Sequence, residues 1–195
     1  MDLKILERSD TRCVEKGLVK ENSRVRHASE DALIDQAIEA AEEYAEGFMN
    51  RPIMLTKFQL RVARVLPEIT LPRPPLVELV SLAYTPKGDA SVEVDLSSVT
   101  EREVDMLSTV TVADLSATSG DMTVVYTAGH EEASDVPSTI VRAVLLLASH
   151  FYKNREATFI DSRVMNVEKK IPYGVRDLLI RHRIPNADSM INGGY

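Results

Sequence analysis

The chain has 195 residues, of which 44% are hydrophobic, and this is enough to form one domain with a substantial core. Its formal net charge of -7 argues against a protein that binds nucleic acid through phosphate contacts, because such binding needs clustered Lys and Arg. A single cysteine, Cys13, excludes an internal disulfide, and no secretory signal pattern precedes it, so we expect an intracellular protein.

The first strong helix signal lies between Ser29 and Asn50. Ser29 has the side chain of an N-cap residue, and Pro52 ends the helix. Apolar residues that recur at spacings of three and four predict its buried face: Leu33, Ala37, Ala41, Tyr44 and Phe48. A shorter and weaker helix is predicted around residues 12–20.

The opposite face of this helix is acidic and carries no basic residue. Its members are Asp35, Glu39, Glu42, Glu43 and Glu46. Such a face is either solvated or meets a positively charged surface, and the sequence leaves both open.

After Pro52 the hydrophobic period changes to two, which indicates strands. Three prolines make residues 71–76 an extended connector. Tight turns are expected at residues 85–88 and 120–121. The predicted strands cover residues 58–62, 77–85, 92–96, 110–115 and 122–127. Together they favour a small antiparallel sheet.

Helical character returns at Pro137 and continues to Arg155. This helix is apolar over most of its circumference, so other helices or another subunit must cover it. Its longest apolar run, Ala143 to Ala148, is far below the roughly 20 residues that a membrane span requires. We therefore expect no membrane association.

The end of the chain has weaker signals. Residues 157–172 have no period, and a connector of this length is usually functional or disordered. A last short helix is expected over residues 173–182, followed by a frayed tail.

The order of these elements predicts an α+β fold in which a helical core is interrupted by a small antiparallel β insertion. Residues 1–51 and 129–184 form the two parts of the helical core. Residues 52–128 form the insertion, and residues 185–195 form a flexible tail.

No catalytic, cofactor or metal site is predicted. The four histidines are scattered without a partner at metal-ligand spacing, and no glycine-rich phosphate loop is present. His130 with Glu131 and Glu132 comes nearest to a ligand cluster, but acids that precede a helix explain it more simply. A small hydrolase that uses His130 with Glu131 or Asp135 remains an alternative.

Charge is distributed unevenly along the chain. The helix over residues 29–50 is acidic, whereas the C-terminal segment is basic. Subunits with such charges could associate head to tail, and such contacts close into rings when the rotation permits. An ordinary mixed-charge surface explains the same pattern equally well.

Several segments, taken in order, resemble the head-tail connector, or adaptor, proteins of tailed bacteriophages and gene transfer agents. They read SEDALIDQAIEAAEEYAEGFMNRPI, LPRPPLVELVSLAY, VVYTAG, VPSTIVRAVLLLASHFYKNRE and IPYGVRDLLIRHR, and span roughly residues 29–183.

The resemblance implies a virion structural protein that is not an enzyme and has no cofactor. It implies a homo-oligomeric, dodecamer-type ring beneath the portal protein at the capsid vertex, joined on its other side to a neck, stopper or tail-completion protein. DNA would pass through the channel of this ring without specific binding, since the chain is acidic. A generic oligomeric interaction module differs only in its partner and stays open.

The resemblance also assigns roles to residues. The helical core and the contact with the next subunit are expected to involve Leu145, Leu147, Phe151 and Tyr152. Docking to the portal is expected to involve Arg176, Arg181 and Arg183.

Overall fold

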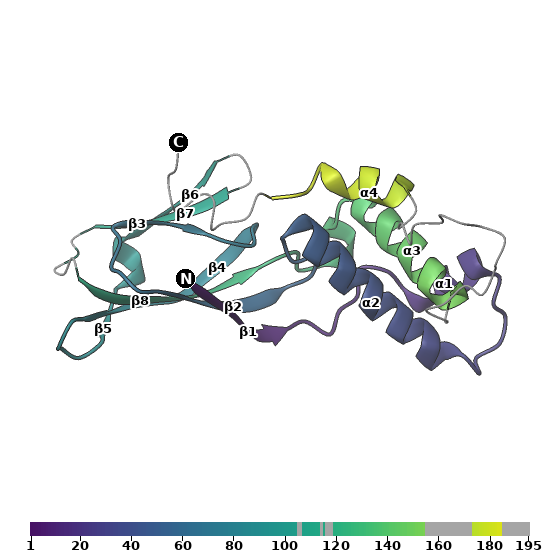
Figure 1. Ribbon diagram of the computed structural model, residues 1–195, viewed down its shortest axis with the longest axis horizontal. Helices are drawn as coiled ribbons and strands as arrows, with labels where there is room; N and C mark the ends of the chain where they lie inside the picture. The colour runs from purple at the N-terminus through teal and green to yellow at the C-terminus, as the bar shows by residue number, and fades with distance from the viewer. Residues whose placement is uncertain (105–106, 114, 116–118, 155–172, 185–195) are drawn as a thin grey trace, which may run out of the picture. The chain divides into compact units, whose positions relative to one another are not determined.

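The computed structural model describes residues 1–104, 107–113, 115, 119–154 and 173–184, and it shows the predicted α+β fold (Figure 1). The predicted segments 157–172 and 185–195 lie outside the described residues. The chain divides into two units. The strands lie in the first unit and the helices in the second.

The first unit contains an antiparallel five-stranded sheet in the order β1-β2-β8-β4-β5. Its strands are β1 (Asp2–Arg8), β2 (Thr56–Val62), β4 (Leu76–Pro86), β5 (Val92–Glu93) and β8 (Gly120–Ala128). In β2 and β8 nearly every second residue is buried, which confirms the strands predicted from the period of two.

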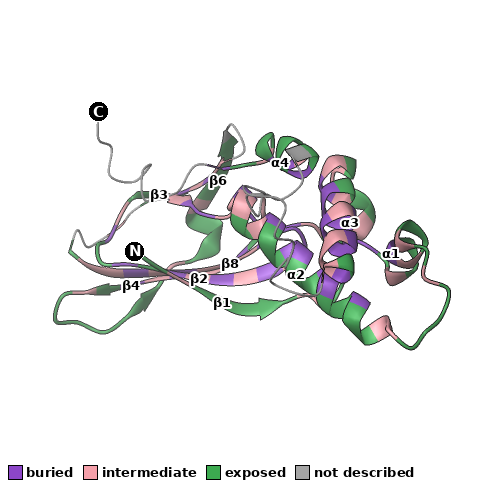
Figure 2. Ribbon diagram, turned by 45° about the vertical axis from the view of Figure 1, so that its right-hand side comes forward, coloured by how far each residue is buried: buried purple, intermediate pink, exposed green. Residues whose placement is uncertain are grey.

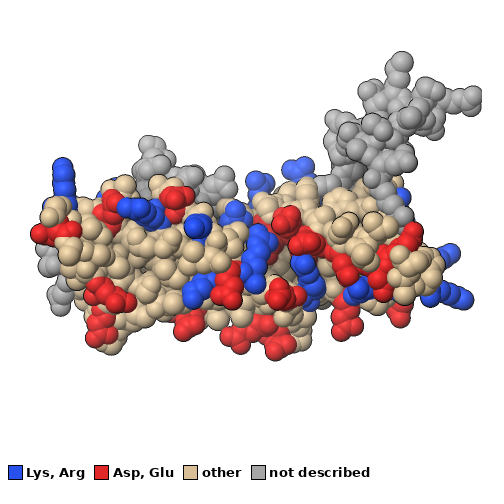
Figure 3. Space-filling view, turned by 90° about the horizontal axis from the view of Figure 1, so that it is seen from below, with Lys and Arg blue, Asp and Glu red and all other residues tan. Residues whose placement is uncertain are grey.

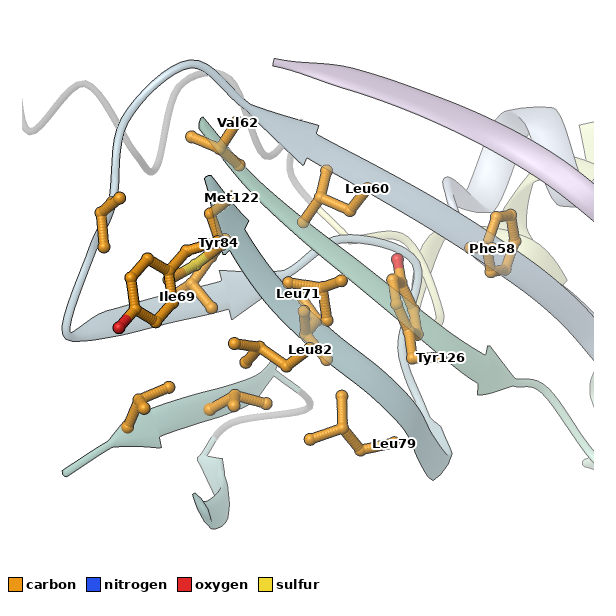
Figure 4. Close-up of a cluster of buried hydrophobic side chains, with 14 of the residues drawn as sticks. Phe58, Leu60, Val62, Ile69, Leu71, Leu79, Leu82, Tyr84, Met122 and Tyr126 are labelled. Atoms are coloured by element: carbon orange, nitrogen blue, oxygen red, sulfur yellow. The ribbon is translucent and has the colours of Figure 1, made fainter. Parts of the chain in front are cut away.

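A second sheet of three strands has the order β3-β7-β6. Its strands are β3 (Glu68–Leu71), β6 (Val99–Val104) and β7 (Leu107–Val112), and a short 3-10 helix, η1 (Leu96–Ser98), precedes β6. Apolar side chains from both sheets form one shared core (Figure 4). At its centre Tyr126 packs on Phe58, with ring centroids 5.5 Å apart, and donates its hydroxyl hydrogen to the carbonyl of Pro72. The proline connector therefore also completes the core.

The sequence did not predict β1, β3 or β6. The residues of β1 and most of those described in β6 are exposed on both faces of the strand, so the apolar alternation that reveals a strand is missing there. β3 has only four residues. β1 places residues 1–10 in the first unit, whereas the sequence interpretation assigned residues 1–51 to the helical core.

Gly129 ends β8 at the join between sheet and helix. Its φ of 115° lies in the region that favours glycine, and an added Cβ would lie 2.4 Å from the carbonyl oxygen of Met54. The neighbouring His130 exchanges backbone hydrogen bonds with residues 53 and 55. Any larger residue at position 129 would disrupt this close contact.

The second unit consists of helices. These are α1 (Lys16–Ser23), α2 (Asp31–Met49), α3 (Ser138–Lys153) and α4 (Tyr173–Ile180), with a 3-10 turn, η2 (Ala133–Asp135), before α3. α1, α2 and α4 all pack against α3, and buried residues cover much of its surface (Figure 2). Most of the apolar circumference of this helix is thus covered within the single chain, and Val141, Leu146 and Phe151 stay half-buried. No described helix is both long and apolar enough to cross a bilayer.

The predicted buried face of α2 was partly wrong. Leu33 and Tyr44 are 41% and 37% exposed. The buried face is instead formed by Ile34, Ala37, Ile38, Ala41, Glu42, Ala45 and Met49. The predicted and the observed residues both recur at helical spacing. Which set is buried depends on where the other helices pack on α2.

The start of α2 also differs from the prediction. Ser29 Oγ lies 2.8 Å from His27 Nδ1, and the carbonyl of Glu30 accepts the N–H groups of Leu33 and Ile34. Ser29 is therefore one residue too early to cap the helix.

Candidate functional site

The residues predicted for the core and subunit contact lie on α3. Leu145, Leu147 and Tyr152 are 5%, 0% and 8% exposed, whereas Phe151 is half-buried beside His150. Tyr152 donates its hydroxyl hydrogen to the Glu30 carboxylate. Three of the four side chains therefore pack inside the single chain, and Phe151 alone of the four keeps substantial exposure.

Glu42 is buried, although the sequence placed it on a solvated or partner-facing acidic surface. Its carboxylate accepts the backbone N–H of Cys13 at 2.8 Å and the Arg12 guanidinium at 2.9 Å. Burial, and next the Glu42 carboxylate, raise the pKa of the Cys13 thiol. Cys13 is therefore an unreactive buried thiol.

Three further acids of α2 pair with basic residues from the preceding segment. Arg12 lies 3.4 Å from Glu39, Lys16 lies 2.7 Å from Asp35 and Lys20 lies 2.7 Å from Asp31. The hydrogen bond from Lys20 lowers the pKa of the Asp31 carboxyl. The acidic face thus meets positive charge, as the sequence allowed, but the charge comes from its own chain. We call these three pairs, with Glu42, the paired flank.

The spacing of charged residues in the sequence explains the arrangement of the paired flank. The basic residues recur every four positions, as do their acidic partners, and the pairs run in opposite directions along the chain. This is the pattern of two antiparallel helical segments with charges on facing turns. Sequence reasoning missed Arg12, Lys16 and Lys20, but this spacing could have revealed them.

The residues predicted to dock the portal lie on α4 and in the three residues after it. Arg176, Arg181 and Arg183 are exposed. The guanidinium carbons of Arg176 and Arg183 lie 6.0 Å and 5.4 Å from the ring centroid of Phe48 on α2. Among the described residues, no acid forms an ion pair with either arginine. We call Arg176, Arg183 and Phe48 the arginine flank.

The backbone beneath the arginine flank is well anchored. Val175 and Leu179 of α4 are fully buried. His182 Nε2 lies 2.7 Å from the Thr139 hydroxyl of α3, and its backbone N–H donates to the Leu179 carbonyl. Arg183 is therefore held close to α3, within one turn of the helix end.

The hydrolase alternative has little geometric support. His130 is half-buried at the end of the sheet, and Glu131, Glu132 and Asp135 are exposed. Within the described residues, no group of three or more His, Cys, Asp or Glu is placed to hold a metal ion.

Acidic and basic side chains are interspersed over the face shown in Figure 3. A face that binds a nucleic-acid duplex would instead show a broad patch of basic side chains. That face of the chain therefore does not have the character of a nucleic-acid surface.

Comparison with protein families matched residues 18–183 to the phage gp6-like head-tail connector proteins. No curated protein sequence matched. Among solved structures, the chain is similar to one from the virion of a native gene transfer agent particle, with 20% identity and a TM-score of 0.76. It is also similar to chains from the neck of an empty gene transfer agent particle with C6 symmetry (20%, 0.73) and of a native one with C12 symmetry (21%, 0.65). Each alignment covers 95% of this chain and 97% of the other. At this identity the likeness shows a shared fold.

Proposed function

Since the chain belongs to the phage gp6-like head-tail connector family, we propose that it is one subunit of a homo-oligomeric ring in the neck of a tailed phage or gene transfer agent particle. The observation that carries this proposal is the family match, which spans residues 18–183 and so includes most of α1, the whole of the other three α-helices and every strand except β1. A connector of this kind is a structural component of the virion.

A closed ring is supported by the solved structures with the same fold. Two of them come from particle necks described with C6 and C12 symmetry. A dodecamer-type ring would fit both symmetries, because a twelve-fold axis contains a six-fold one.

We assign the portal protein to one side of the ring and a neck, stopper or tail-completion protein to the other. The exposed arginines Arg176, Arg181 and Arg183 are the proposed portal contact, because their positive charge is available on the surface. DNA would pass through the channel without being held, which is consistent with a net charge of -7.

For the contact between subunits we propose that Phe151 takes part, since it is the residue of the predicted set that stays half-exposed. Leu145, Leu147 and Tyr152 support this contact from within the core. A Leu147→Asp variant would unfold the helices before it reported on assembly, so Phe151→Ser is the better test.

The sheet region over residues 52–128 is proposed to be an insertion into the helical part of the chain. The division into two units supports this, because the helical unit contains segments from both sides of the sheet region. A structural role without catalysis is favoured over a hydrolase by the family match.

The proposal is tested by multi-angle light scattering over a concentration series, with negative-stain images of the heaviest species. The full-length protein is measured alone and with the portal protein of the same particle. Closed rings, free or on the portal, are the expected result. A protein that stays monomeric and ignores the portal would overturn the proposal, and hydrolase assays on His130→Ala would then become the next step.

A further inference from the structure

The arginine flank differs from the other charged contacts of the helical unit in lacking an acid. Arg12, Lys16 and Lys20 each have carboxylate partners within 3.4 Å. Arg176 and Arg183 instead share one aromatic ring, and no described acid pairs with them. Both side chains are exposed, so two permanent positive charges lie on the surface of the described part of the chain.

Phe48 lies in contact range of both guanidinium groups. Each guanidinium carbon lies within 6.0 Å of the same ring centroid. The distance between the two carbons is therefore at most the sum of these two distances. A cation over an aromatic face is attracted to the ring, and this restricts two otherwise flexible side chains. Arg181 is exposed on the same segment, but no contact between it and Phe48 is present.

The anchoring of α4 makes the arrangement preorganised. Leu179 is fully buried, and His182 is hydrogen-bonded to Thr139, so the backbone between the two arginines is anchored. Groups that are already ordered lose less conformational entropy when a ligand binds. The pair is therefore suited to capturing anionic groups.

We propose that Phe48 positions Arg176 and Arg183 as a two-guanidinium clamp for an acidic segment of a partner protein. This inference rests on the proposed function, in which α4 contacts the portal, and it identifies the chemistry of that contact. Guanidinium groups bind carboxylates through paired hydrogen bonds, so two neighbouring Asp or Glu side chains would match the clamp.

A protein carboxylate is favoured over DNA phosphate as the ligand. Duplex binding depends on many basic contacts along the backbone, whereas the clamp offers two on a chain whose net charge is -7. Short DNA duplex therefore serves as the competing probe.

The test measures binding of a fluorescein-labelled octaglutamate peptide to the full-length protein by anisotropy, at low and high salt. The double variant Arg176→Gln/Arg183→Gln should weaken binding by at least about tenfold and flatten its salt dependence. The control Arg102→Gln/Arg142→Gln removes two exposed arginines that lie on β6 and α3, outside the clamp and outside the proposed portal contact, and should change affinity by about twofold or less.

Phe48 is tested as a positioning residue by Phe48→Leu and Phe48→Tyr. Loss of the ring in Phe48→Leu should weaken peptide binding roughly threefold, and Phe48→Tyr, which keeps the ring, should restore it. Circular dichroism checks that each variant is folded. If Phe48→Leu did not fold, Phe48→Tyr and the double arginine variant would still decide the question.

Several outcomes would overturn the clamp. These are an octaglutamate affinity unchanged in Arg176→Gln/Arg183→Gln, equal losses in that variant and in the control Arg102→Gln/Arg142→Gln, no peptide binding by the wild type, or tighter binding to duplex DNA than to the peptide. Failure of the proposed function is separate, because it appears as a wild-type protein that forms no rings. If rings form on the portal and the double variant docks equally well, the clamp is wrong and the connector role stands.

Discussion

The paired flank and the arginine flank lie in the same helical unit and use their charges in opposite ways. On the paired flank, three basic residues neutralise acids of α2, and the partly exposed Arg12 reaches the buried Glu42. On the arginine flank, two arginines gather on Phe48 without an acid among the described residues. Charge is thus used internally on one side and left available on the other.

This difference shows that a run of charge in the sequence does not reveal its use. The acidic helix suggested a surface for another subunit, yet four of its acids, Asp31, Asp35, Glu39 and Glu42, pair with the chain's own residues 12–20. A head-to-tail contact between this acidic face and the basic segment of a neighbour would have to compete with these internal pairs. Contacts between subunits that leave the paired flank intact therefore cost less free energy.

The largest effect is expected at Glu42. Glu42→Ala should lower the free energy of unfolding by about 2–4 kcal/mol, because it removes the acceptor of a buried backbone N–H and the partner of Arg12. Glu39→Ala is the matched control, since the Glu39 side chain is 57% exposed, and should cost less than about 1 kcal/mol. Urea unfolding followed by circular dichroism measures both, and equal losses would show that Glu42 is not a buried anchor.

The reactivity of the Cys13 thiol tests the same buried contact, because the backbone N–H of Cys13 donates to Glu42. The thiol is buried and its pKa is raised, so we expect it to react with a disulfide reagent at least about 100-fold more slowly in the native protein than in urea. Glu42→Gln should speed the native reaction roughly tenfold by loosening the segment. Fast labelling of the native wild type would contradict the buried position.

Removal of a basic residue should lower the free energy of unfolding more on the paired flank than on the arginine flank. Lys16→Ala should lower the free energy of unfolding measurably at low salt, and less at high salt, because its partner Asp35 is on the surface. Arg176→Ala should leave the free energy of unfolding within about 0.5 kcal/mol of wild type, since the clamp contributes to binding rather than folding. A larger loss at Arg176 than at Lys16 would reverse the comparison.

The smallest effect concerns acid stability at Asp31. Its pKa is lowered in the folded chain by the hydrogen bond from Lys20, so the folded state favours the charged carboxylate. This contribution is present above the unfolded pKa of about 3.9 and is lost as the pH falls through the lower folded value. A Lys20→Met variant should therefore be less stable than wild type at pH 6 in urea melts, and the difference should shrink below about pH 4. A difference that grew on acidification would show that the pair does not act this way.

Local patterns in the sequence predicted the strands and helices that have one apolar face. β2, β8, α2 and α3 were found because burial leaves a clear period. β1 left no such signal, since nearly all of its residues are exposed. The buried side of α2 could not be chosen from spacing alone, because Leu33 and Ile34 begin equally regular stripes.

The candidate surfaces were predicted less completely than the fold. The basic C-terminal residues were identified, but the ring that groups two of them was assigned to the core stripe of α2. A cation over an aromatic ring joins residues more than 120 positions apart, and a local pattern cannot show this. The burial of Glu42 was missed for the same reason, since its partners lie 29 and 30 residues away in the sequence.

The position of β1 has a consequence for the way the chain is made on the ribosome. β1 is synthesised before the strands that it joins: its partner β2 begins at Thr56, and β8, which separates β2 from β4 in the sheet, ends at Ala128. At translation rates of about 5–20 residues per second, the first strand waits several seconds for a complete sheet. During that time its exposed Ile5 and Leu6 can meet other nascent chains. The charged residues and the irregular register beside Leu6 would then act as protection against premature association of strands.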